Sequence, residues 1–305
     1  MLTVTGTIGI DTIYTPDGTH RENILGGSCT YFAAAASFYA PVAIVAAVGE
    51  DFPKPFRDTI ARFPNINTSG LETRAGSKTF RWGGKYQTDM DHRDTLFTDL
   101  NILLEHPPLV PEPLRRSPFV FLANMHPALQ RSLLESFHSP ALAVADTMDL
   151  WINSARPDLE RLLASVHGLV LNYDEAELFT GVRNPVAAGR RILVRGPRFV
   201  IIKKGEHGAI LVHRDAIAAL PAYPAETVVD PTGAGDSFAG GLMGSLAASN
   251  ARDPADFDTL RRAMVHAAVV ASYTIEAFSL DRLATLTRAE LDARTRDYLR
   301  MLRVD

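Results

Sequence analysis

The chain has 305 residues, of which 46% are hydrophobic and 22% are charged, a globular composition that excludes a mostly disordered or fibrous protein. Its 31 Lys and Arg residues are outweighed by 35 Asp and Glu residues, so the net charge is −4. No broad positive surface is therefore expected for a nucleic acid or an anionic membrane. The length predicts a large domain with a buried core.

The first part of the chain contains the features that indicate the cellular location of the protein. A single cysteine, Cys29, excludes an internal disulfide and favours a reducing environment. The opening residues lack the basic segment of a secretory signal. Residues 26–49 carry no charge and are long enough to cross a bilayer, but Pro41 divides them into a small-residue helix at 28–39 and a buried strand. We expect a cytoplasmic protein without a membrane or nucleic-acid partner.

Short apolar runs rich in β-branched residues alternate with helical patterns along the rest of the chain. Several runs show no polar alternation, which is typical of strands covered by helices on both faces. The predicted strands are Leu2–Ile10, Val42–Val48, Phe119–Ala123, Leu142–Ala145, Leu169–Leu171, Phe199–Ile202 and Ala209–Val212. The later predicted helices are Pro55–Phe63, Pro127–Phe137, Asp158–Val166, Ala187–Val194, Asp236–Ala248, Asp256–Tyr273 and Arg288–Leu302. This order predicts an α/β fold with a mostly parallel sheet between two helical layers.

Residues 73–101 interrupt this alternation. Polar and apolar side chains alternate there, and Gly83-Gly84 is predicted to form the turn of a hairpin. Together with residues 12–23, this segment is expected to form a small β lid over the sheet. A surface excursion without a function explains the same pattern.

The most informative segment is TVVDPTGAGDSFAGGLMG at residues 227–244. Gly233-Ala234-Gly235 leads into a helix that begins near Asp236. Small residues at a helix N-terminus let consecutive backbone N–H groups point outward and bind an anion. A helix cap would explain Asp236 alone, but not the glycines inside the helix, each of which costs about 1 kcal/mol relative to alanine. We interpret those glycines, Gly240, Gly241 and Gly244, as marks of a ligand or other backbone approaching closely.

The segment DPTGAGDSFAGG resembles the C-terminal signature of the ribokinase/PfkB family of carbohydrate and nucleoside kinases. Gly26-Gly27, Asn172-Tyr173-Asp174-Glu175 and the loop KKGEHG at 203–208 resemble three further family motifs, in the family's order. The resemblance implies a ribokinase-like three-layer sandwich with a β lid, as a single domain over residues 1–305. It implies an enzyme that transfers the γ-phosphoryl group of ATP to a hydroxymethyl group of a sugar. In some members the lid makes a homodimer contact.

The resemblance also implies the roles of the catalytic residues. Asp236 would be the catalytic base, and the amides of Gly233, Ala234 and Gly235 would bind the transferring phosphoryl group. The helix dipole is expected to keep Asp236 ionised at neutral pH. Asn172 and Glu175 resemble the pair that orders Mg²⁺ through water, although an ordinary helix N-cap explains them equally.

Other residues resemble the nucleotide and cation contacts of the family. The family's ATP-contacting loop is matched by Lys203, Gly205 and Gly208. A solvent-exposed lysine and the glycines of a hairpin would explain the same sequence. Thr232 is expected near the nucleotide. Asp230, with Thr232, resembles the positions that hold a monovalent cation such as K⁺ in some members.

The acceptor is less well defined. By the resemblance, Asp11 binds acceptor hydroxyls and Gly27 lets the acceptor approach the backbone; a turn aspartate explains Asp11 equally. Tyr31 stands where many sugar-specific members carry Asn, and the segment DTMDLW at 146–151 lacks the Asn and Arg of the fructokinase-like pattern. A nucleoside is therefore the alternative acceptor to a sugar.

Aromatic and basic residues of the lid bear on the choice of acceptor. Tyr31 could stack on a base together with Phe80, Trp82 and Tyr86 of the lid, although ordinary cross-strand packing explains those aromatic residues too. For the second phosphate of a sugar phosphate only the lid cations Arg81, Lys85 and Arg93 are available. A binding protein without turnover is a further alternative, but the intact GAGD segment favours an enzyme.

Overall fold

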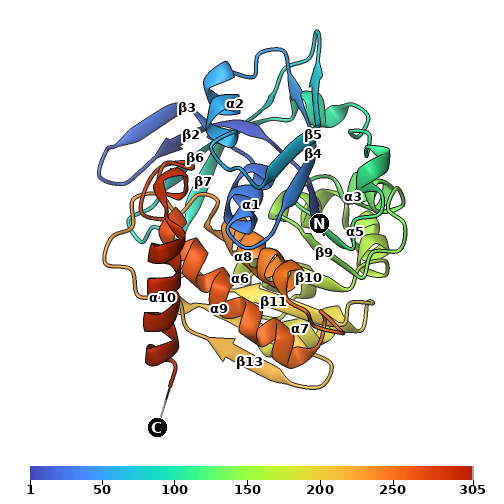
Figure 1. Cartoon of the computed structure of the whole chain (residues 1–305), viewed down its shortest axis with the longest axis vertical. Helices are drawn as coiled ribbons and strands as arrows, with labels where there is room; N and C mark the ends of the chain where they lie inside the picture. The colour runs from blue at the N-terminus through green and yellow to red at the C-terminus, as the bar shows by residue number, and fades with distance from the viewer. Residues whose placement is uncertain (304–305) are drawn as a thin grey trace.

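A nine-stranded sheet lies at the centre of the molecule, and a separate four-stranded sheet lies at one end of it (Figure 1). The computed structural model describes residues 1–303. The order of the large sheet is β13-β12-β11-β10-β9-β8-β1-β4-β5, and its strands are parallel from β5 to β11. Only β12 and β13 run antiparallel to their neighbours. Its strands are β1 Leu2–Thr5, β4 Val42–Gly49, β5 Ile66–Arg74, β8 Phe119–Leu122, β9 Leu142–Asp146, β10 Gly168–Asn172, β11 Phe199–Lys203, β12 Ala209–His213 and β13 Ile217–Leu220.

Helices cover both faces of this sheet and form two separate apolar cores. One core lies mainly beneath α1, α8 and α9, and the other lies beneath α3, α5, α6 and α7. The strands between them are buried along their whole lengths because side chains on both faces meet a helix. The helices are α1 Ser28–Ser37, α2 Lys54–Ile60, α3 Pro127–Leu134, α4 Asp149–Ser154, α5 Arg156–Leu163, α6 Tyr173–Thr180, α7 Pro185–Leu193, α8 Ala234–Ala248, α9 Phe257–Thr274 and α10 Arg288–Met301.

The four-stranded sheet is the predicted lid. Its strands are β2 Gly9–Tyr14, β3 His20–Gly26, β6 Phe80–Tyr86 and β7 Arg93–Asp99, in the order β3-β2-β6-β7. The first part of the lid is wider than the predicted range 12–23, because β2 begins at Gly9 and β3 ends at Gly26. The second part is narrower than the predicted range 73–101, because its strands run from Phe80 to Asp99. The predicted strand Leu2–Ile10 is divided, since the chain leaves the large sheet after Thr5 and enters the lid at Gly9.

The prediction of a turn at Gly83-Gly84 is wrong. Both glycines lie inside β6, at an irregularity in its pairing with β7, and the chain turns later, at residues 87–92. A side chain at Gly83 would collide with the ring of Phe97, and one at Gly84 with the ring of Trp82. The glycines are therefore needed to seat aromatic rings on the sheet.

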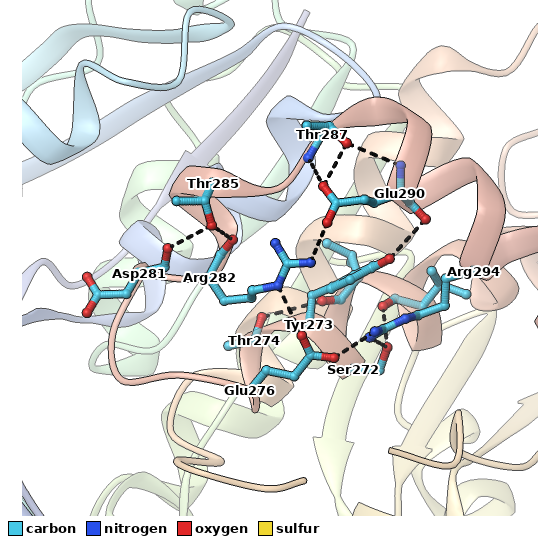
Figure 2. A network of polar contacts seen from close by, with 12 residues as sticks. Ser272, Tyr273, Thr274, Glu276, Asp281, Arg282, Thr285, Thr287, Glu290 and Arg294 are labelled. Atoms are coloured by element: carbon cyan, nitrogen blue, oxygen red, sulfur yellow. Dashed lines mark hydrogen bonds and ion pairs between the residues drawn. The ribbon is translucent and has the colours of Figure 1, made fainter. Parts of the chain in front are cut away.

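The C-terminal part of the chain supports the segment that precedes the glycine loop. In the network of Figure 2, Glu276 forms ion pairs with Arg282 at 3.0 Å and with Arg294 at 2.7 Å. The neighbouring Ile275 carbonyl accepts a hydrogen bond from Val229 N–H at 2.8 Å. The network thus fixes the chain that leads into GAGD.

The predicted α/β architecture is confirmed, and most predicted helices agree with the observed ones to within a few residues at each end. The strands β5 and β13 were not predicted; β5 has a polar, half-exposed sequence, INTSGLETR, that lacks the apolar signature of its neighbours. No helix within residues 1–303 is both long and apolar enough to span a bilayer. The charge-free residues 26–49 form a helix and a strand, as expected.

Candidate active site

The carboxyl ends of the parallel strands and the lid enclose a cavity of about 650 Å³. This is the usual place for a ligand in a parallel α/β sheet. The cavity brings together nearly all the residues that the sequence singled out: Asp11, Gly27, Tyr31, Asn172, Glu175, Lys203, Gly205, Thr232, Gly233, Ala234, Gly235 and Asp236. Gly208 and Asp230 do not line it. Gly208 instead has a positive φ of 85° and packs against the Leu220 carbonyl, as a hairpin glycine does.

The glycine loop opens α8 at the wall of this cavity. Gly233 is the N-cap of α8 and has a left-handed conformation with φ 75°. The ring of Tyr31 packs against it, so a side chain at Gly233 would be excluded by space as well as by conformation. A Cβ on Gly235 would lie 2.6 Å from Lys203 Nζ, which places that ammonium group beside the loop. The N–H groups of Gly233 and Gly235 thus meet a cation where an anion is expected, whereas the Ala234 N–H donates to the Pro231 carbonyl at 3.1 Å.

Of the two explanations that the sequence offered for the glycines farther along α8, the close approach of other backbone is the one observed. Side chains at Gly240 and Gly244 would collide with the backbone of α1, and one at Gly241 would collide with α9. Close helix packing requires them. The glycines inside the helix therefore contact neighbouring helices, and only the GAG segment faces the cavity.

Asp236 lies in the first turn of α8. Burial raises the pKa of this carboxyl, and the charges of Lys203 and then Arg93 oppose that rise. Burial thus acts against the helix dipole, which was expected to keep Asp236 ionised at neutral pH. A raised pKa makes the carboxylate a stronger proton acceptor.

Asp146, at the end of β9, is a site residue that the sequence analysis missed. It is 5% exposed, and Oδ1 has no hydrogen-bond partner among residues 1–303. Burial, followed by the charge of Asp236, raises its pKa well above the ordinary value, while Lys203 lowers it. Its sequence signal, a carboxylate directly after a buried strand, was considered only as a departure from the fructokinase-like pattern.

Asn172 and Glu175 form a reciprocal capping box at the start of α6. Glu175 N–H donates to Asn172 Oδ1 at 2.8 Å, and Asn172 N–H donates to Glu175 Oε2 at 2.7 Å. The two residues thus do form the helix N-cap that was one of the two interpretations of this motif. Both residues nevertheless line the cavity, and burial raises the pKa of Glu175.

Asp230 lies behind the glycine loop and is fully buried. Its Oδ1 accepts a hydrogen bond from Thr232 N–H at 2.9 Å, but Oδ2 has no partner in the described part of the chain. Burial raises the pKa of this carboxyl to about 6, against the hydrogen bonds from Thr232. A buried carboxylate oxygen without a partner is costly, and a bound cation would compensate it.

Asp11 lies on β2, at the lid side of the cavity. It packs so closely on Gly26 that a side chain at that position would overlap its carboxyl group. Burial, followed by the charges of Asp230 and Asp236, raises its pKa to about 8. Its Oδ1 has no partner within residues 1–303, so it is available to an acceptor hydroxyl.

Part of the remaining wall of the cavity is apolar. Trp151 donates Nε1–H to Asn124 Oδ1 at 2.9 Å, which fixes the plane of the indole. Tyr31 is 1% exposed beneath Gly233, and Gly233 covers part of its ring. The apolar wall consists of Phe80, Trp82, Leu100, Leu103, Met125, Met148, Leu150 and Trp151.

The lid contacts the body of the protein beside the glycine loop and at the loop after β11. The hydroxyls of Tyr86 and Thr232 are 3.0 Å apart. At the tip of the lid, Asp91 packs against Gly205 in the loop after β11. Among the lid cations considered for a second phosphate, Arg93 lines the cavity, whereas Arg81 and Lys85 do not.

Comparisons with known proteins agree with this geometry. Residues 137–282 match the sequence model of the pfkB family carbohydrate kinases. A cytidine kinase of Thermococcus kodakarensis is 29% identical over 247 residues, which cover 79% of this chain and 87% of that protein.

Solved structures share the fold over nearly the whole chain. A ribokinase from Giardia lamblia superimposes with a TM-score of 0.81 at 18% identity, over 97% of this chain and 99% of that chain. A nucleoside kinase of Burkholderia thailandensis in complex with inosine superimposes with a TM-score of 0.77 at 20% identity, over 98% of each chain.

The fold, the site and these relatives together define an ATP-using phosphotransferase with an alcohol group as acceptor. The family match over residues 137–282 and the shared fold support an assignment to the ribokinase/PfkB family of carbohydrate and nucleoside kinases.

Proposed function

We propose that this enzyme is a nucleoside kinase, which transfers the γ-phosphoryl group of ATP to the hydroxymethyl group of a nucleoside. The apolar wall is the observation that supports this choice over a free sugar. A sugar carries hydroxyls on every side and would lose hydrogen bonds to water against Trp82, Met125 and Trp151, whereas the faces of a base pack well on such side chains. The similarity to a cytidine kinase points the same way.

In the proposed reaction Asp236 accepts the proton of the acceptor hydroxyl. The hydroxyl oxygen forms a bond to the γ-phosphorus of ATP, and the bond to the oxygen that bridges the β- and γ-phosphates breaks. The amides of Gly233 and Gly235, together with Lys203, bind the charge on the transferring group. Asp11 binds the hydroxyls of the ribose and sets its orientation.

The residues present fit a divalent cation on the phosphates. Asp146 and Glu175 are oxygen donors at the strand ends, and Asp146 Oδ1 lacks a partner in the described chain. Residues 1–303 hold no group of three or more His, Cys, Asp or Glu side chains that could bind a metal alone. That suits Mg²⁺, which takes most of its ligands from phosphate and water and neutralises the charge of the transferring group. Asn172 would orient the water ligands through Glu175.

Asp230 is the residue that would hold a monovalent cation such as K⁺. Its unpartnered Oδ2 lies behind the glycine loop, where a positive charge would strengthen the anion site. Dimerisation through the lid and a cytoplasmic location stay predictions.

The experiment that tests the function is a screen of ATP consumption over nucleosides, pentoses, hexoses and sugar phosphates, with identification of the phosphorylated product. We expect turnover with nucleosides and little with free sugars. Turnover with sugars alone would overturn the proposal in favour of a sugar kinase, and no turnover with any acceptor would indicate a binding protein.

The Asp236→Asn variant is the matched control for this screen. It keeps the size and hydrogen-bonding shape of the side chain but cannot accept the proton. We expect ATP binding by calorimetry to be retained and turnover to fall by roughly 10²- to 10⁴-fold. Near-normal turnover would show that Asp236 is not the base.

A further inference from the structure

We propose that Arg93 is a catalytic residue that the lid delivers to the transferring phosphoryl group. The proposal rests on the kinase reaction described above, but it does not depend on whether the acceptor is a nucleoside or a sugar. It assigns to the lid a part in the chemistry itself, in addition to covering the acceptor.

The position of Arg93 is the first observation. It is the first residue of β7, pairs with Tyr86 across the lid hairpin, and lines the cavity that also contains Asp236 and Lys203. Its guanidinium carbon lies 5.4 Å from the centre of the Trp82 ring, which gives the side chain an apolar support. The residue thus extends from the lid into the site.

The charge of Arg93 is not used elsewhere. Another cavity arginine, Arg183, pairs with Glu177 at 2.7 Å, and the lid residue Arg81 approaches Asp51 at 3.7 Å. Within residues 1–303, Arg93 forms no ion pair with a carboxylate.

Arg93 shares its cavity with the other groups of the proposed reaction. Asp236, the proposed base, and Glu175, the carboxylate of the proposed metal site, line the same cavity as Arg93.

Two contacts hold the lid in the position that brings Arg93 there. The Tyr86 hydroxyl, directly across the hairpin from Arg93, is 3.0 Å from Thr232 in the segment before the glycine loop. Two residues before Arg93 in the chain, Asp91 packs against Gly205. Arg93 lies next to both contacts, so its place depends on a closed lid.

The chemistry explains why a cation is needed at this point. In phosphoryl transfer the charge spreads over the three equatorial oxygens of the transferring group, and catalysis consists mainly of positioning and charge stabilisation. Lys203 and the loop amides approach from the body of the protein, next to the acidic Asp146 and Asp236. A guanidinium from the lid side binds two of these oxygens with a planar pair of donors.

The test compares Arg93→Gln and Arg93→Lys with Lys85→Gln, which removes an exposed charge from the same lid outside the cavity. With the acceptor that the wild type phosphorylates, we expect Arg93→Gln to lower kcat about 10²- to 10³-fold, with the affinity for ATP changed only a few-fold. Arg93→Lys should recover part of the loss, and Lys85→Gln should match the wild type. An unchanged kcat in Arg93→Gln, or a rise in KM alone, would overturn the proposal.

A binding measurement keeps the test independent of the acceptor. ADP with aluminium fluoride imitates the transferring phosphoryl group. We expect Arg93→Gln to bind this pair at least about ten-fold more weakly than the wild type, while it binds ADP alone equally well. Equal binding of the pair by both proteins would overturn the role of Arg93, even if the screen found an acceptor. If the screen found no turnover with nucleosides but Arg93→Gln still bound ADP with aluminium fluoride more weakly, the proposed acceptor would be wrong and the role of Arg93 would stand.

Discussion

The carboxyl groups of the cavity owe their properties to burial more than to any single partner. Asp11, Asp146 and Asp236 all have raised pKa values, and burial is the largest cause for each of them. Cations counter this effect at Asp146 and Asp236, but Asp11 has acidic neighbours instead. The carboxyl proposed to bind the acceptor and the proposed base are thus set differently by their surroundings.

Asp11 makes stability depend on pH. Its folded pKa is about 8, above the ordinary value of 3.8, so the unfolded chain ionises first as the pH rises. The stability associated with protonated Asp11 is complete below about pH 4 and is lost progressively as the pH rises to about 8. We therefore expect Asp11→Asn to melt higher than the wild type at pH 8 in the absence of ligands.

This prediction is checked by melting both proteins across the pH range from 5 to 9. The difference in Tm should grow with pH and level off above about 8. Asp94→Asn, which removes an exposed lid carboxyl, is the control and should show no such trend. A difference that does not change with pH would contradict the raised pKa of Asp11.

At the scale of the element, α8 combines a binding terminus with a packing surface. Its first turn faces the cavity, while Gly240 and Gly244 admit α1 and Gly241 admits α9. The low helix propensity of glycine is therefore offset by close contact between helices, and the site at the N-terminus is held by that packing.

Gly240→Ala separates these two effects. Helix propensity alone would stabilise the protein by about 1 kcal/mol. The added methyl group would meet the carbonyl oxygen of Phe32, which belongs to the backbone of α1 and cannot move freely. We expect net destabilisation of roughly 1–3 kcal/mol in denaturant unfolding. An exposed change on the same helix, Ala248→Ser, should stay within about 0.5 kcal/mol, and a stabilised Gly240→Ala would refute the packing argument.

At the scale of the whole molecule, the sequence predicted the sheet with its two helical layers and the glycine loop at the cavity. It did not predict where the chain passes from the large sheet into the lid. The apolar strands and the GAGD segment were located correctly because each is defined by local pattern. The strand over residues 2–10 was not divided, because its apolar pattern continues from one sheet into the other.

Contacts between distant segments explain what the sequence could not predict. Gly83-Gly84 resembles a turn until the rings of Phe97 and Trp82 are placed over it. The importance of Asp146 and Arg93 depends on their distance from Asp236, and local pattern carries no information about that distance.

A lid that excludes water from the site predicts slow hydrolysis of ATP without an acceptor. Tyr86→Phe removes the contact with Thr232 and should raise the ratio of ATP hydrolysis to acceptor phosphorylation several-fold. Tyr14→Phe, which removes the exposed lid contact with Glu22, is the matched control and should leave this ratio unchanged. Fast acceptor-independent hydrolysis by the wild type would count against exclusion of water by the lid.

The path of the chain between the two sheets has an evolutionary consequence. The carboxylate proposed for the acceptor lies on β2 of the lid, whereas the proposed base lies on α8 of the body. Mutations in the lid strands can therefore change the preferred alcohol while the residues around Asp236 stay as they are. A scaffold divided in this way can diversify its substrates by successive single substitutions without passing through inactive ancestors.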